Sequence, residues 1–114
     1  MNKRGKTVFG NYLVEQIKAA DMSQEEFYTA VEIKKPYFYD ILRASPPPTD
    51  IQNRMLKVLD NKTGENEERR RKLYDLAAAE RGEIPADIVE MISSHPDDID
   101  EIRTMLAKLF ATQR

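Results

Sequence analysis

The 114-residue chain has no cysteine and only one histidine. Without cysteine, disulfide bonds and thiolate chemistry are excluded, and a structural zinc site would need the histidine and carboxylates alone, an unusual ligand set. Although 40% of the residues are hydrophobic, no apolar run approaches the roughly 20 residues that span a bilayer. We therefore expect a soluble, cytoplasmic protein without a metal site.

Glycine is scarce as well, with four residues, and no phosphate-cradling glycine loop occurs. The sequence contains no nucleophile elbow and no paired catalytic constellation. The acidic residues at 97, 98, 100 and 101 lack the glycine and the spacing of a calcium loop, and favourable charges in the first turn of a helix explain them better. We expect neither an enzyme nor a cofactor.

Charge is distributed unevenly, although the net charge is only -2. Residues 1–62 hold 10 lysine and arginine residues against 8 acidic ones, a net charge of +2. Residues 63–114 hold 8 against 12, a net charge of -4. If one part of the chain binds nucleic acid, this distribution favours the N-terminal part.

Apolar residues recur at helical spacing and no strand-like alternation is present, which predicts an all-α protein. The first helix is expected at about 8–20, where Phe9, Leu13 and Ile17 are four residues apart. Thr49 and Gln52 predict a capping box for the fourth helix, and a polar break is expected at 60–66. The remaining helices are expected at about 24–31, 35–43 and 67–81, the last ending at Gly82, with two more opening at Pro85 and Pro96.

The segment at 22–43, with the sequence MSQEEFYTAVEIKKPYFYDILR, carries the strongest local signal. Ser23 and Glu26 have the spacing of a reciprocal capping box, and Pro36 stands where a second helix would begin. Two short helices joined by a tight turn are therefore expected. A helix-turn-helix presents its second helix to the major groove of DNA.

This segment resembles the helix-turn-helix of the lambda repressor and Cro-like (XRE) transcriptional regulators. The resemblance covers about residues 7–60, from FGNYL at 9–13 through the fourth helix, and LYDLAAAERGEIPADIVEMI at 73–92 is similar to an extension in one branch of these regulators. It implies a lambda repressor-like bundle of four to five helices. The DNA-binding domain would occupy residues 1–62, and a helical extension, with dimerisation as one role, residues 63–114.

The resemblance also implies residues that touch DNA. A glutamine at the start of the second helix commonly contacts the DNA backbone in this family, and Gln24 stands at the matching position. Lys34 and Lys35 match positions that approach phosphates and base edges at the start of the recognition helix, about 35–43. A lysine there can donate to guanine O6 or N7.

Four further residues of the recognition helix belong to the expected interface. Tyr39 and Asp40 lie one turn on, where the family reads the groove, and a carboxylate can accept from a cytosine amino group. Pro36 occupies a position where many relatives carry a hydrogen-bonding reader, so only apolar contact, for example with a thymine methyl, is expected. Arg43, at the exit of the helix, would hold the DNA backbone.

Two functional hypotheses follow. In the first, the protein is a sequence-specific DNA-binding transcriptional regulator, a repressor that binds double-stranded operator DNA. In the second, the same fold is a protein-interaction module, antitoxin-like or an adaptor, that has lost sequence-specific DNA binding. The acidity of the chain favours the second hypothesis. Three residues would mark the lost DNA code: Tyr28, where relatives usually have a small residue, Glu32, where they often have glycine, and Pro36, where many have a hydrogen-bonding reader.

The last expected helix carries an apolar stripe at spacings of three and four, formed by Ile99, Ile102, Leu106, Leu109 and Phe110. Such a stripe must be buried, either against the fifth and sixth helices of the same chain or in a homodimer. A dimer would place two recognition helices about one DNA turn apart, which suits a palindromic operator. The basic run at 69–72 is expected to be solvated, because a helix distributes consecutive residues around its circumference.

Overall fold

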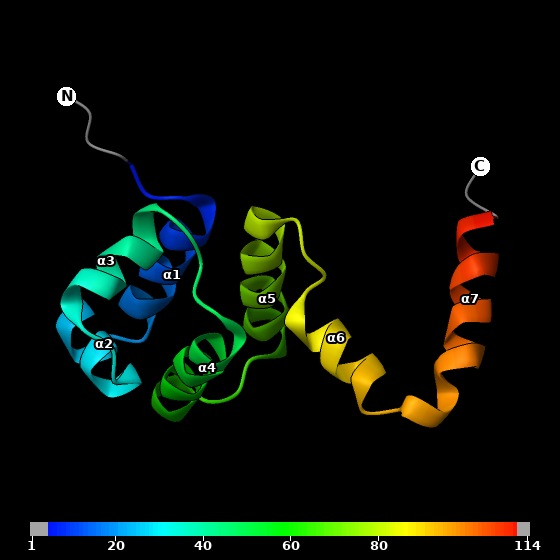
Figure 1. Cartoon of the computed structure of the whole chain (residues 1–114). Coiled ribbons are helices and arrows are strands. Elements are labelled where there is room, and N and C mark those ends of the chain that lie inside the picture. The colour runs from blue at the N-terminus through cyan, green and yellow to red at the C-terminus, as the bar shows by residue number, and fades with distance from the viewer. Residues whose placement is uncertain (1–4, 112–114) are drawn as a thin grey trace.

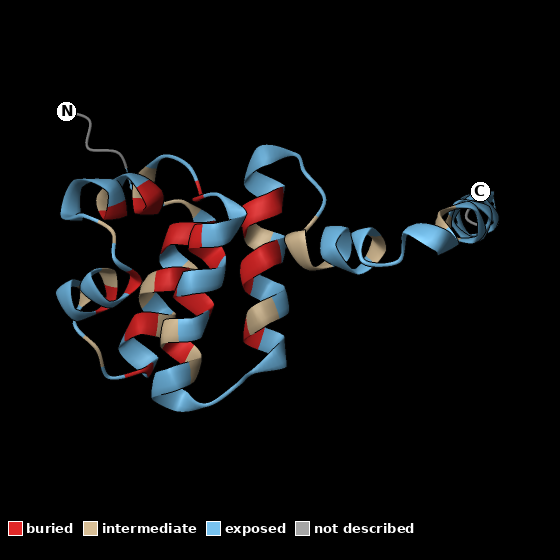
Figure 2. Ribbon diagram, turned by 60° about the horizontal axis from the view of Figure 1, so that its bottom comes forward, coloured by how far each residue is buried: buried red, intermediate tan, exposed pale blue. Residues whose placement is uncertain are grey.

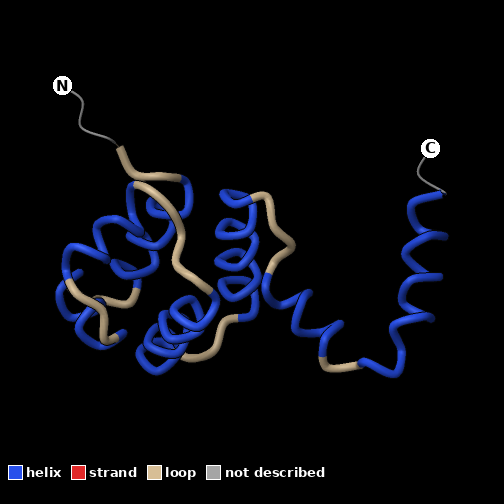
Figure 3. The backbone as a smooth tube through the Cα atoms, viewed as in Figure 1, coloured by secondary structure: helices blue, strands red, loops and turns tan. Residues whose placement is uncertain are grey.

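The computed structural model describes residues 5–111, and within them the chain forms helices and loops without a strand (Figures 1 and 3). The all-α prediction is thus confirmed for this part of the chain. The elements are α1 (Val8–Ala19), α2 (Gln24–Val31), α3 (Lys35–Arg43), α4 (Thr49–Thr63), α5 (Glu67–Arg81), α6 (Ala86–Ser93), a 3-10 turn η1 (Pro96–Asp98) and α7 (Ile99–Ala111). No helix in residues 5–111 has the length and apolar character needed to cross a membrane.

Side-chain caps start the first two helices. The Thr7 hydroxyl accepts from the Gly10 N–H at 2.9 Å and begins α1. At α2, the Ser23 hydroxyl accepts from the Glu26 N–H at 3.0 Å, and the Glu26 carboxylate accepts from the Ser23 N–H at 2.8 Å. The predicted capping box at Ser23 and Glu26 is therefore confirmed.

The start and the end of α4 differ from the prediction. Pro48 is the N-cap residue and no side chain caps the helix. The Gln52 side chain is buried, and its amide group donates to the Pro47 carbonyl at 2.8 Å. Gln52 therefore hydrogen-bonds to the backbone of the proline run and forms no capping box with Thr49. The helix also continues through Thr63, which leaves only residues 64–66 of the predicted break at 60–66 outside a helix.

One hydrophobic core is shared by α1 to α5 (Figure 2). The α5 helix lies along α1 and contributes Leu73, Tyr74 and Ala77 to the same cluster as Phe9 and Leu13. The core therefore crosses the boundary expected after residue 62. The apolar side of α5 packs on α1 although the opposite side of the helix is charged. The net charge of a segment therefore does not show whether that segment belongs to the core.

The distance between α1 and α3 is set by Gly10. A Cβ atom added at this residue would lie 2.1 Å from the Leu42 carbonyl oxygen, so the two helices approach more closely than a side chain would allow. The Thr7 N–H donates to the same carbonyl at 2.9 Å. The C-terminal end of α3 is thereby held against the start of α1.

Beyond α5, the chain leaves the bundle after the start of α6, where Ala86 packs against the core. We call α6, η1 and α7 together the C-terminal arm (residues 86–111), and Figure 1 shows it projecting from the side of α5. Neither α6 nor α7 has a buried residue. In the structure, α7 therefore does not pack on the fifth and sixth helices, which was one of the two arrangements expected from the sequence.

Candidate nucleic-acid interface

Helices α2 and α3 are joined by a three-residue turn that requires one left-handed residue. Glu32 has φ 70° and ψ 41°. Its N–H donates to the Thr29 carbonyl at 3.0 Å, and the Ile33 N–H donates to the Tyr28 carbonyl at 3.0 Å. This is a Schellman motif, which usually places glycine at the left-handed position. The turn keeps the geometry that favours glycine although glutamate occupies it.

The Tyr28 side chain is accommodated at the crossing of α2 and α3. Its ring centroid lies 5.3 Å from that of Phe38, with the two planes inclined by 43°. Phe27 approaches Phe38 as well, at 6.2 Å between centroids. Tyr28 is half-buried, so the tyrosine lies across the edge of the α2–α3 contact and adds to its aromatic packing.

Burial divides α3 into two faces. Phe38, Ile41 and Leu42 are buried in the core. Pro36, Asp40 and Arg43 follow one another at intervals of four and three residues, so they share the opposite face of the helix. We call them the α3 outer face. Pro36 and Asp40 are exposed and Arg43 is half-buried.

Three more residues of α3 and its N-cap lie beside the α3 outer face. Lys34 is the N-cap residue of α3 and Lys35 its first residue, and both are exposed. Among the described residues, neither lysine forms a salt bridge. Tyr39 is half-buried, and the Arg43 guanidinium carbon lies 5.7 Å from its ring centroid, which holds Arg43 along the helix.

The charge of this surface is mixed. The α3 segment contributes three cationic groups, Lys34, Lys35 and Arg43, against one carboxylate, Asp40. Gln24 begins α2 and is half-buried, and the next two residues of that helix are glutamates. The structure thus places six of the seven expected contact residues together on one helix and its N-cap, while Gln24 lies on the preceding helix.

The pKa of Glu26 is lowered from its ordinary value because the backbone and side chain of Ser23 hydrogen-bond to its carboxylate. Burial raises the pKa of the Tyr74 hydroxyl, which donates to the Asn53 side chain. Glu26 lies in the first turn of α2, whereas Tyr74 lies on α5 and contacts α4. No cluster of three potential metal-ligating side chains is found among the described residues.

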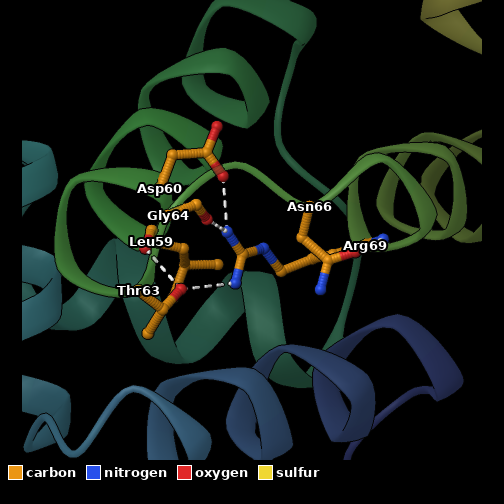
Figure 4. Close-up of polar contacts among 6 residues, drawn as sticks. All are labelled: Leu59, Asp60, Thr63, Gly64, Asn66 and Arg69. Carbon is orange, nitrogen blue, oxygen red and sulfur yellow. Dashed lines mark hydrogen bonds and ion pairs between the residues drawn. The ribbon is translucent and has the colours of Figure 1, made fainter.

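Arg69 has a role that its sequence context did not indicate (Figure 4). It is 5% exposed, and its guanidinium donates to the Thr63 hydroxyl at 2.9 Å, to the Gly64 carbonyl at 2.9 Å and to the Asp60 carboxylate. The prediction of solvation is therefore wrong for Arg69, because the α4–α5 turn folds back over it. The one signal for this contact in the sequence is the opposite charge of Asp60 and Arg69, which are nine residues apart.

Two neighbours in the same basic run are held against tyrosines. The Arg70 guanidinium carbon lies 5.2 Å from the Tyr74 ring centroid, and the Lys72 ammonium lies 5.1 Å from the Tyr12 ring centroid. These cations support the packing of α5 and do not extend the charged surface of α3. The candidate interface is thus confined to α2, α3 and their turn. Comparisons of the chain with protein-family models, curated proteins and solved structures find no match to any of them.

Proposed function

We propose that the protein is a sequence-specific DNA-binding transcriptional regulator of the lambda repressor-like type. In this proposal α2 and α3 form a helix-turn-helix, and α3 enters the major groove of double-stranded DNA. One observation supports it above the others. The buried face of α3 fixes the helix to the bundle, while its outer face and the lysines at its start remain accessible.

Each accessible group has a defined role in the proposal. Lys34 and Lys35 contact phosphates and guanine edges, and Asp40 accepts from a cytosine amino group. Arg43 and Gln24 hold the DNA backbone, which positions α3 without reading sequence.

The two remaining residues supply less polar contacts. Tyr39 stacks on a sugar or a base, and Pro36 offers apolar contact to a thymine methyl. Two copies bound to a palindromic operator would act as a repressor by occupying the DNA, and no catalytic group is required.

The first test titrates the purified protein against mixed genomic DNA at several salt concentrations. Each phosphate that is neutralised steepens the slope of log K against log salt by about 0.9. We expect a steep slope together with enrichment of one sequence among the bound fragments. A flat slope without enrichment would contradict the proposal.

The second test is Lys35→Glu, assayed on the enriched sequence. Reversing this charge places a carboxylate beside the DNA, so we expect binding to be abolished while helicity and thermal stability stay close to wild type. Lys57→Glu, an exposed lysine on α4, makes the same charge change away from α3 and should bind nearly as wild type does. Unchanged binding by Lys35→Glu would remove Lys35 from the interface.

The second candidate function is a protein-interaction module of the same fold. It is favoured by Asp40 on the α3 outer face and by the exposed carboxylate of Glu32 at the turn, because both repel phosphate. This function predicts a flat salt slope and no sequence enrichment from a fully folded protein. The first test therefore separates the two candidates.

A further inference from the structure

A cavity of about 660 Å³ lies between α4, α5 and α6, at the place where the C-terminal arm leaves the bundle. Figure 1 shows α6 beginning beside α5. Three of the residues that line the cavity, Gln52, Tyr74 and Ala78, are buried and come from α4 and α5. Its volume lies within the roughly 300–1,000 Å³ of small-molecule sites. The size of the cavity therefore suits a small organic molecule.

Apolar side chains of the arm, and of the loop before it, line the cavity and remain exposed. Ile84 is 61% exposed and Val89 is 45% exposed. Ala86, which also lines the cavity, is half-buried. Removing apolar surface from water is favourable, so these side chains favour an occupant whose own body is apolar.

The charged residues that line the cavity, Glu83 and Glu90, are both acidic. Within residues 5–111, no lysine or arginine lines it. The negative charge also reaches the buried side of the cavity. The pKa of the Tyr74 hydroxyl is raised first by burial, and the carboxylates of Glu90 and Asp87 raise it further. The cavity therefore favours a cation and disfavours a phosphate or a carboxylate.

Two arginines beside the cavity offset these carboxylates only in part. Arg81 lies 4.0 Å from Glu83, at the limit of an ion pair, and also donates to a backbone carbonyl of the proline run. Arg70 lies 3.9 Å from Glu90 and closer, at 3.5 Å, to Glu67. Glu83 and Glu90 are exposed, so their carboxylates are accessible to a cationic molecule.

The lining of the cavity also includes a buried amide whose oxygen has no partner. Gln52 is 5% exposed, and its Nε2 donates to the Pro47 carbonyl. Its Oε1 accepts no hydrogen bond from any of the described residues. A buried acceptor without a donor is unfavourable, so this side of the cavity favours an occupant with an N–H or O–H group at its inner end.

We propose that this cavity binds an amphipathic amine, a small molecule with an ammonium group at one end, an apolar body and a hydrogen-bond donor at the other end. The ammonium group pairs with Glu83 and Glu90, and the body covers Ile84 and Val89. The donor reaches the amide of Gln52. Such a ligand contacts the bundle and α6 together. The proposal does not depend on DNA binding.

Titration of the full chain with matched small molecules, followed by saturation-transfer NMR, tests the ligand class. Tyramine carries a phenol and an ammonium group, and phloretate carries the same phenol with a carboxylate in place of the ammonium. Phenethylamine keeps the ammonium group and lacks the hydroxyl. We expect saturable binding of tyramine, weaker binding of phenethylamine and the weakest binding of phloretate. Absence of saturable tyramine binding, or phloretate binding as tight as that of tyramine, would overturn the proposal.

Variants of exposed residues place the binding site while leaving the core unchanged, which circular dichroism checks. Glu90→Gln should weaken tyramine binding by about two- to fivefold, as expected for a solvent-exposed ion pair, and Glu80→Gln, on the outer side of α5, should not. Val89→Trp fills the cavity and should abolish binding, whereas Met91→Trp, on α6 outside the cavity, should bind as the wild type does. Wild-type affinity in either Glu90→Gln or Val89→Trp would overturn the proposal. Because no DNA is present, these results are independent of the Lys35→Glu test.

Discussion

At the scale of single residues, the turn between α2 and α3 depends on Glu32. A left-handed backbone at a residue with a side chain is unfavourable by roughly 1–2 kcal/mol, because Cβ approaches the following carbonyl oxygen. Glu32 adopts it because the Schellman hydrogen bonds and the half-buried Ile33 fix the direction in which the chain leaves α2. The packing of α3 thus outweighs the local preference of glutamate.

Glu32→Gly should stabilise the protein. Glycine removes the Cβ strain but increases the freedom of the unfolded chain, so we expect the free energy of unfolding to rise by about 0.5–1 kcal/mol. Urea denaturation followed by circular dichroism measures this change. Ala30→Gly, at an exposed helical position of α2, should instead lower stability by about 1 kcal/mol. A less stable Glu32→Gly protein would mean that the glutamate side chain stabilises the turn.

Residue patterns predicted which side chains of α3 are exposed better than they predicted the contacts of α5 that support the bundle. The exposure of Lys34, Lys35 and Pro36 follows from helical spacing, since the apolar residues of α3 occupy the other side. The burial of Arg69 does not follow from spacing, because it depends on the path of the α4–α5 turn over the guanidinium. Contacts between a charged side chain and backbone carbonyls leave little trace in a sequence.

At the scale of elements, α2 is short and depends on its capping box. It has eight residues, and its first turn is closed by the reciprocal hydrogen bonds of Ser23 and Glu26. The sequence predicted this cap correctly because both partners lie within four residues. It failed at Thr49 because the burial of Gln52, which no local spacing encodes, directs its amide to Pro47.

The stability contributed by the α2 cap should depend on pH. The pKa of Glu26 is lower in the folded protein than its ordinary value, so its contribution is present above about pH 4.3 and is lost as the pH falls through the folded pKa. Glu26→Gln keeps an acceptor but cannot ionise. Its stability should be below that of the wild type at pH 7, and the difference should shrink as the pH falls below about 4.3.

Urea denaturation midpoints of both proteins, measured from neutral to acidic pH, check this prediction. Glu25→Gln makes the same charge change in the same turn outside the capping box, and its difference from wild type should be smaller. If the two variants showed the same pH dependence, the effect would come from the general charge of the turn and not from the hydrogen bonds to Ser23.

At the scale of the whole molecule, a packed bundle of α1 to α5 carries an arm with no buried residue. The sequence predicted each helix but not this division. The apolar stripe of α5 packs into the bundle, whereas the apolar stripe of α7 stays exposed. In the sequence, both stripes show the same helical spacing of apolar residues. Which stripe finds a partner depends on tertiary geometry, because loop lengths and crossing angles decide whether a helix reaches the core.

A chain that ends at Ile84 should keep the fold of the bundle. The truncation removes no buried residue, so at low protein concentration we expect its free energy of unfolding to lie within about 1 kcal/mol of the full chain. A chain that ends at Asn66 lacks α5, including Leu73, Tyr74 and Ala77, and should be largely unfolded by circular dichroism.

Protein concentration separates the role of the arm from that of the bundle. The apolar stripe of α7 is not buried within the chain, which leaves the homodimer as the other expected arrangement. A dimer that forms only from folded chains raises stability by mass action, so the denaturation midpoint of the full chain should rise with its concentration. The midpoint of the chain ending at Ile84 should not change, because it lacks α7. A truncated chain that unfolds, or whose midpoint also rises with concentration, would show that the arm supports the bundle directly or that dimerisation uses another surface.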